Sequence, residues 1–178
     1  PDNGEIRVCG HPVGMESKKI TSFLPDRNYL PKWMKVRDCL ALFQDFYQDF
    51  DMHKAENILN LLGLEKYQTF NALSKGNAEK LHLALVLSRK AQLYLLDEPI
   101  GGVDPAARDY ILKMIVQHYV EDSTMIVATH LVADIEKIFD EVIFLDRGEI
   151  KLSGSVDEIR EKQGKSLDQI FREVYYVG

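Results

Sequence analysis

The first residues of the chain alternate apolar and polar side chains over short distances. This pattern predicts a strand over residues 4–9, which Gly10 and Pro12 end. A second strand is predicted over residues 19–24. The following residues, 25–35, contain two prolines and predict a loop.

The pattern changes at Val36, where apolar side chains begin to recur every three or four residues. That spacing predicts an amphipathic helix. A second helix is expected to begin after Asp51, which can cap it, and to end at Gly63. Residues 36–72 therefore predict a helical subdomain inserted between sheet segments.

The second half of the chain predicts an alternation of helices and strands. Residues 77–90 are apolar around much of a helix, which predicts a buried helix. The short apolar run of residues 93–96 is typical of a central parallel strand covered on both faces. The remaining predicted elements are a helix over 105–119, a strand over 124–128, a helix over 131–139, a hairpin over 141–152, and two closing helices with capping boxes at Ser155 and Ser166. We therefore expect an α/β fold with a mainly parallel sheet flanked by helices.

Composition narrows the classes of function. The chain has 178 residues, 46% of them hydrophobic, and a net charge of −6. That charge provides no broad positive field, so we expect no nucleic-acid partner. Cys9 and Cys39 show no metal-binding spacing and are expected to be small core residues. No stretch reaches the ~18 apolar residues of a spanning helix, so a membrane connection would require a partner.

Two adjacent carboxylates, Asp97 and Glu98, follow the apolar run. At the end of a parallel strand they lie at the sheet edge where α/β proteins bind ligands. One carboxylate can hold Mg²⁺ while the other orients an attacking water. The alternative is an ordinary strand end.

Two further segments have the chemistry of phosphate contacts. The residues Ser74, Lys75, Gly76 and Asn77 open a helix, where a hydroxyl and free amides can bind phosphate oxygens. His130 follows the strand over 124–128 and can contact a γ-phosphate. Taken alone, the serine is better explained as a plain helix cap, and a lone histidine indicates little.

The order of these segments is similar to that of ABC ATPase domains. LSKGN resembles the ABC signature, LYLLDEP the Walker B motif, GGVD the D-loop and ATH the His switch. The similarity runs from about residue 1 to residue 152 and implies an ABC-type fold of the P-loop NTPase class. It also implies an ATPase, with ATP and Mg²⁺ as cofactors.

The resemblance implies roles for individual residues. Asp97 would bind Mg²⁺, Glu98 would be the general base or orient the water, and His130 would contact the γ-phosphate. The signature residues 74–77 would serve ATP held by the opposite subunit, and Asp104 would lie at the dimer interface. The expected assembly is a head-to-tail homodimer or heterodimer.

Two departures from the family pattern change what the resemblance implies about ATP binding and metal contact. The chain has no G-x-x-x-x-G-K-[S/T] string, the Walker A loop that holds the phosphates. Truncation explains this better than natural loss, so we expect an active parent protein and a fragment that does not bind ATP tightly alone. Asp26 stands where the family has its Q-loop glutamine and is either a metal contact or a solvated acid.

The segment DRNYLPKWM resembles the part of transporter ATPases that meets the membrane subunit. Tyr29, Trp33 and Met34 are thus candidate contacts with a separate permease, although Trp33 can equally pack on the helical subdomain. The implied location is cytoplasmic and peripheral, on the inner face of the cell membrane. The alternatives are a non-transport ABC ATPase, of the translation or DNA-repair type, and a non-catalytic interaction domain.

The predicted organisation has four parts. They are a sheet segment with the Q-loop region over 1–35, the helical subdomain over 36–72, a core with the signature, Walker B, D-loop and His switch over 73–153, and a helical tail over 154–178.

Overall fold

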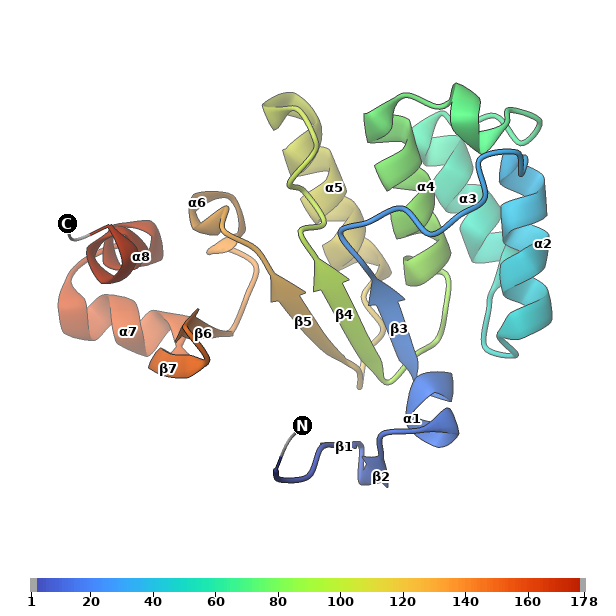
Figure 1. Ribbon diagram of the computed structural model, residues 1–178. Helices are drawn as coiled ribbons and strands as arrows, with labels where there is room; N and C mark the ends of the chain where they lie inside the picture. Colours follow the sequence, from blue (N-terminus) through green and yellow to red (C-terminus); the bar gives the residue numbers. More distant parts are fainter. Residues whose placement is uncertain (1–2, 177–178) are drawn as a thin grey trace. The chain divides into compact units, whose positions relative to one another are not determined.

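The computed structural model describes residues 3–176, without the side chains at positions 106 and 107. The chain divides into two compact units, Pro1–Thr129 and His130–Gly178. The first contains a parallel sheet flanked by helices, and the second contains an antiparallel hairpin and three helices (Figure 1). The predicted α/β class is confirmed, while the four predicted parts remain predictions.

The sheet of the first unit has the strand order β3–β4–β5, and all its strands are parallel. The strands are β3 (Thr21–Leu24), β4 (Leu93–Asp97) and β5 (Thr124–Ala128). Strand β4, which carries the unbroken apolar run of residues 93–96, is central, as that run predicts. Since Leu24 pairs with Leu96, and Asp97 pairs with Ala128, the three strands end at one common edge.

The two faces of this sheet differ in burial. Tyr94 and Leu96 are almost fully buried, on the face that α4 and α5 cover. On the opposite face Phe23, Leu95 and Ile126 form a row across the three strands. Phe23 and Ile126 are each 54% exposed, so the prediction of a strand covered on both faces is wrong for the described residues. We call this row the open sheet face; Figure 1 views the sheet from this side, with α4 and α5 behind it.

Helix α4 (Lys75–Leu87) forms the centre of the first unit. All seven residues over 81–87 are buried, as the apolar pattern predicts. The helix contacts β3, α2 (Val36–Phe46), α3 (Met52–Leu62) and α5 (Pro105–His118). The hydroxyl of Ser22 in β3 donates to the Val86 carbonyl at 2.9 Å, which fixes the helix to the sheet.

The inserted helices end as the sequence indicates. The Asp51 side chain accepts a hydrogen bond from the Lys54 amide at 2.9 Å and caps α3. Gly63 takes a left-handed conformation at φ 68° and ends the same helix. Helix α2 stops at Phe46, and the short helix η1 (Phe70–Ala72) leads back to α4.

A buried arginine ties these helices to the sheet. Arg89 is 2% exposed, and its guanidinium donates to both carboxylate oxygens of Asp49 at 3.0 Å. It also donates to the backbone carbonyls of Thr21 and Lys19, and it lies 3.9 Å from the ring centroid of Tyr47. Because these partners satisfy the buried charge, Arg89 joins the α2–α3 connection to the start of β3.

The beginning of the chain differs from the prediction. Only β1 (Arg7–Val8) and β2 (His11–Pro12) form strands, joined by a turn at Cys9 and Gly10. Both turn residues have positive φ, 48° and 81°. Cys9 is therefore exposed, and only Cys39 is the buried core residue expected of both. Helix α1 (Met15–Lys19) was not predicted, and it takes the first part of the expected strand over 19–24.

The second unit is built around the predicted hairpin. Strands β6 (Glu141–Asp146) and β7 (Glu149–Ser155) turn at Arg147 and Gly148, which both have positive φ. The other elements are α6 (Val132–Ile135), much shorter than the predicted helix over 131–139, α7 (Val156–Gln163) and α8 (Leu167–Tyr175). The core of the unit joins one face of the hairpin to these helices and consists of Val132, Phe144, Val156, Ile159, Leu167 and Ile170.

Candidate functional site

The adjacent carboxylates lie at the carboxyl edge of the sheet. Asp97 is the last residue of β4, and Glu98 follows it with a left-handed φ of 47°. A non-glycine residue in this conformation is strained and must be held by its surroundings. The Glu98 amide donates to the Ala128 carbonyl at 2.8 Å, which extends the pairing of β4 with β5 by one residue.

The Glu98 carboxylate also has a direct partner. The Thr129 hydroxyl donates to Glu98 Oε2 at 2.9 Å. On the other side the Gly101 amide donates to the Glu98 carbonyl at 3.0 Å. A Cβ at position 101 would lie 3.2 Å from both Glu98 Cβ and Oε2, so the turn after Glu98 is close to its side chain.

Sequence reasoning missed the role of Thr129, because that role depends on the register of the strands. Asp97 pairs with Ala128, so the residues that follow each of them, Glu98 and Thr129, leave neighbouring strands at the same level. A hydroxyl at that position of the next strand can reach the carboxylate.

The predicted phosphate-contact segment begins α4. Ser74 is the N-cap, and its hydroxyl accepts a hydrogen bond from the Asn77 amide at 3.2 Å. The Lys75 side chain is 79% exposed, and Gly76 and Asn77 are half-buried. The segment is therefore a helix cap and also a positive helix end open to an anion.

The loop after the carboxylates packs on the first turns of α4. A Cβ at Gly102 would lie 1.9 Å from Glu79 Oε1 and 2.8 Å from Lys75 Cε, so only glycine fits without movement. Lys75 and Glu79 form an ion pair at 3.9 Å. Asp104 ends this loop, just before α5 begins at Pro105, and its carbonyl accepts from the Arg108 amide at 3.2 Å.

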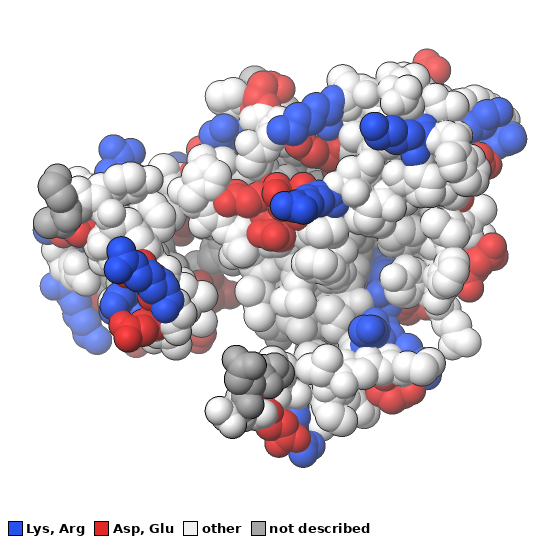
Figure 2. Space-filling view, in the orientation of Figure 1, with Lys and Arg blue, Asp and Glu red and all other residues white. Residues whose placement is uncertain are grey.

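Burial raises the pKa of Glu79, the charge of Lys75 opposes that shift, and the charge of Asp26 adds to it. Asp26 is exposed, two residues beyond the end of β3. Glu79 thus lies where three segments approach one another: the loop after β3, the start of α4 and the loop after β4. The space-filling view shows acidic side chains gathered above the end of β4, next to a basic one (Figure 2).

The described residues fit Mg²⁺ as a single carboxylate ligand, not as a complete metal site. The part of the chain that the structure describes contains no group of three His, Cys, Asp or Glu that could hold a metal. Mg²⁺ at phosphate sites commonly has one or two carboxylate ligands, with phosphates and water as the rest. The half-buried Asp97 at the sheet edge fits such a single ligand.

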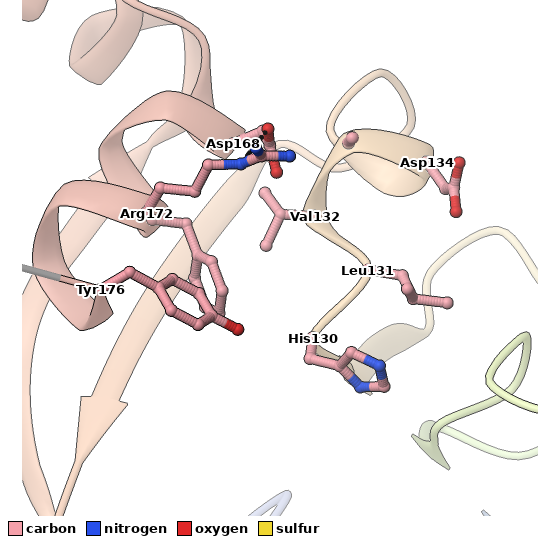
Figure 3. A pocket seen from close by; sticks show the side chains of 9 residues that line it. His130, Leu131, Val132, Asp134, Asp168, Arg172 and Tyr176 are labelled. Atoms are coloured by element: carbon pink, nitrogen blue, oxygen red, sulfur yellow. Dashed lines mark ion pairs between the residues drawn. The ribbon is translucent and has the colours of Figure 1, made fainter.

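His130 belongs to the second unit and is exposed. It lines a cavity of about 450 Å³ together with residues 131–134 and four residues of α8 and its end, Asp168, Phe171, Arg172 and Tyr176 (Figure 3). Arg172 forms an ion pair with Asp168 at 2.9 Å. The role of His130, like those of the other site residues, remains a prediction.

The only Gly-Lys-Ser string in the sequence, residues 164–166, is not a phosphate loop. Gly164 ends α7 in a left-handed conformation, and Ser166 caps α8 with its side chain. The Lys165 ammonium donates to both carboxylate oxygens of Glu173, at 2.6 and 2.8 Å. A phosphate loop follows a strand, whereas this string joins two helices.

The candidate permease contacts differ in exposure. Trp33 is 75% exposed, which contradicts the alternative that it packs on the helices, and Tyr29 is 41% exposed. Met34 is only 7% exposed, so its prediction as a surface contact is wrong. It is buried because the Met34 segment pairs with the chain before α4, where the Phe70 amide donates to the Met34 carbonyl at 2.7 Å.

Beneath Tyr29 lies a histidine that the sequence did not single out. His82 of α4 is 7% exposed, and its ring centroid is 4.6 Å from that of Tyr29. Its Nε2 is 3.0 Å from Asn28 Oδ1, which also accepts from the Leu30 amide at 2.9 Å. Burial lowers the pKa of His82 to about 4, so the ring is neutral at pH 7.

Comparison with known proteins identifies the family. The model of the ABC transporter family matches residues 1–101, which include the start of α4, the two carboxylates and the loop as far as Gly101. The chain belongs to the ABC transporter family. None of the helices in the described part of this ABC protein is long and apolar enough to cross a membrane.

Two relatives are ABC transporter ATP-binding proteins that the chain matches over part of their length. An uncharacterized ABC transporter ATP-binding protein of Synechocystis is 27% identical over 164 residues, covering 88% of this chain and 46% of that protein. The Nod factor export ATP-binding protein I of a Rhizobium species is 29% identical over 180 residues, covering 96% and 59%. The chain therefore spans about half the length of these relatives.

Solved structures agree with the ABC fold. An ATP-binding subunit of an ABC transporter has a TM-score of 0.84 at 23% identity and covers 97% of this chain and 77% of its own. An ABC transporter ATP-binding protein from Pyrococcus furiosus has a TM-score of 0.61 at 25% identity, over 72% of this chain and 65% of its own. The first likeness bears on the fold alone.

Proposed function

We propose that this chain forms the hydrolytic part of an ABC transporter ATPase, in which residues outside the chain supply the phosphate-binding loop. The observation that carries the proposal is the placement of Asp97 and Glu98 at the carboxyl edge of the parallel sheet, where the Glu98 carboxylate is held. The open sheet face supports the part of the proposal that places the phosphate-binding loop outside the chain, because a parallel sheet is normally covered on both faces.

In the proposed reaction, water attacks the γ-phosphate of ATP and gives ADP and phosphate. Glu98 orients the water and accepts its proton, and Asp97 is the candidate ligand of Mg²⁺. The metal supplies neutralisation of the phosphate charge when bound. The start of α4, at Ser74–Asn77, and Asp104 act across a head-to-tail pair of subunits, and His130 contacts the γ-phosphate.

ATP binding and hydrolysis test this proposal. The 178-residue chain alone is expected to bind MgATP more weakly than micromolar in a calorimetric titration, because it lacks the loop that holds the phosphates. The complete protein, with a phosphate-binding loop, should bind and hydrolyse ATP. Glu98→Gln in that protein should retain ATP binding and lower kcat by about 100-fold or more.

A matched substitution controls for the loss of one carboxylate. Glu65 is exposed on the connection after α3, and Glu65→Gln should hydrolyse ATP as the wild-type protein does. Micromolar ATP binding by the chain alone would contradict the missing-loop part of the proposal. A complete protein without ATPase activity would instead indicate the non-catalytic alternative.

We also propose that the ATPase works at the cytoplasmic face of a membrane through a separate permease. Trp33, with Lys32, Thr69 and Asn71, lines a shallow pocket of about 430 Å³, and exposed aromatic side chains are common anchors of protein interfaces. One relative is named as an export ATP-binding protein, which supports a transport role.

The membrane connection is tested by fractionation of cells that produce the complete protein. The wild-type protein should co-purify with membranes, and Trp33→Ala should lower the bound fraction by about tenfold, the usual loss at an aromatic anchor. Phe46→Ala removes an equally exposed ring, 75%, at the last residue of α2 and is the control. A wild-type ATPase that never associates with membranes would favour the non-transport alternative.

A further inference from the structure

We infer that Thr129 is a positioning residue that holds the Glu98 carboxylate in the orientation needed for water attack. This inference rests on the proposed function. Its basis is the hydrogen bond from the Thr129 hydroxyl to Glu98 Oε2 at 2.9 Å, between residues 31 positions apart in the sequence.

The backbone of Glu98 does not by itself fix the carboxylate. Its left-handed φ of 47° and the bond from its amide to the Ala128 carbonyl set the direction in which the side chain leaves the strand. The three side-chain torsions beyond that point are not set by the backbone. A hydrogen bond to the carboxylate removes that freedom, so the oxygen that faces the water is set before ATP arrives.

Thr129 is well suited to this task. Threonine is branched at Cβ, so its side-chain rotamer is restricted and its hydroxyl direction is defined. Both Thr129 and Glu98 are half-buried, where a hydrogen bond to a charged group is stronger than in water. The turn at Gly101 approaches the carboxylate closely on the other side, since a Cβ added there would lie 3.2 Å from Glu98 Oε2.

The position of Thr129 also follows from the sheet. Asp97 and Ala128 are paired, and the next residues of the two strands are Glu98 and Thr129. Pairing of the parallel strands therefore brings the donor and the carboxylate, each one residue beyond its strand, to the same edge. Positioning from a strand end is more precise than positioning from a flexible segment.

The test measures steady-state ATP hydrolysis by the complete protein and its variants. Thr129→Val removes the hydroxyl with little change in shape and should lower kcat by about 10- to 100-fold, the effect of losing one hydrogen bond to a charged group. The KM for ATP should stay within about twofold, because ground-state binding of ATP does not involve this bond. Thr129→Ser keeps the hydroxyl and should restore most of the wild-type kcat.

Two comparisons separate positioning from a structural effect. Thr124→Val makes the same change at the exposed, opposite end of β5 and should leave kcat unchanged. In a Glu98→Gln background, adding Thr129→Val should have no further effect, because the carboxylate that Thr129 orients is absent. Thr129→Ala provides a second variant if the valine protein does not fold.

The outcomes are distinguishable. Wild-type kcat in both Thr129→Val and Thr129→Ala, or an equal loss of kcat with and without Glu98, would overturn the inference alone. A wild-type complete protein that does not hydrolyse ATP would overturn the proposed function and the inference together.

Discussion

His82 shows how one buried side chain can make stability depend on pH. Its ring lies in the core between Tyr29 and Phe70, at centroid distances of 4.6 and 5.5 Å. Since burial lowers its pKa from 6.5 to about 4, the unfolded chain binds a proton in this range that the folded chain does not. The contribution of His82 to stability is therefore complete above pH 6.5 and is lost as the pH falls toward 4.

Urea unfolding at pH 7 and pH 5 measures this effect. The wild-type chain should lose about 2 kcal/mol of unfolding free energy more than His82→Gln between these pH values. Glutamine keeps an amide that can donate to Asn28 but carries no charge at either pH. His11→Gln, at an exposed position, is the control. Equal pH dependence in the wild-type and His82→Gln chains would contradict the prediction.

At the level of single residues, the sequence predicts the two carboxylates of the site but not the side chain that contacts one of them. Asp97 and Glu98 stand out because two acids directly follow an apolar run. Thr129 does not, because its neighbour in space is 31 positions away and only strand pairing brings the two together. The burial of Met34 could not be predicted from the sequence either, since it depends on the segment that returns from α3 to α4.

Among the elements, the two predicted capping boxes differ in the structure: one forms and the other does not. Ser166 and Gln169 form the expected reciprocal capping box of α8. Ser155 begins α7 but makes no side-chain capping bond. The difference lies in the context, because Ser155 is also the last residue of β7, paired with Glu141, so the strand constrains its backbone. A local motif predicts a helix start, whereas tertiary pairing decides how the cap is made.

The close packing of Gly102, in the loop after β4, on Glu79 of α4 can be tested with a pair of substitutions. Gly102→Ala should displace the Glu79 and Lys75 side chains and cost about 1 kcal/mol of unfolding free energy, because the ends of flexible side chains can move aside. Glu79→Ala should make room, so the double variant should be more stable than the sum of the single changes predicts. Urea unfolding measures all three variants.

The glycine at position 76 is the matched control. It lies in α4, and a Cβ there would meet open space, so Gly76→Ala should be neutral or stabilising by about 0.5 to 1 kcal/mol. Strictly additive effects of Gly102→Ala and Glu79→Ala would show that the two segments are not coupled. Coupling would show that the loop before Asp104 and the first turns of α4 stabilise each other.

For the whole molecule, periodicity predicted the class and the order of most elements, but not the burial of the sheet. The helical insert, the central β4 and the hairpin all follow from local patterns. The sequence of β4 indicates cover on both faces, and the structure covers one. The apolar side chains of a strand predict burial but do not specify which segment covers them. The chain spans about half of its relatives' length.

The row Phe23, Leu95 and Ile126 should also influence how the chain behaves in solution. An exposed apolar surface of this kind is expected to bind hydrophobic dyes and to promote self-association at high concentration. Replacing Phe23 and Ile126 together by threonine, which retains strand propensity, should reduce the fluorescence of bound anilinonaphthalene sulfonate and delay precipitation. Phe46→Thr, outside the sheet, should change neither, so the colloidal behaviour of the chain would be traced to one face of its sheet.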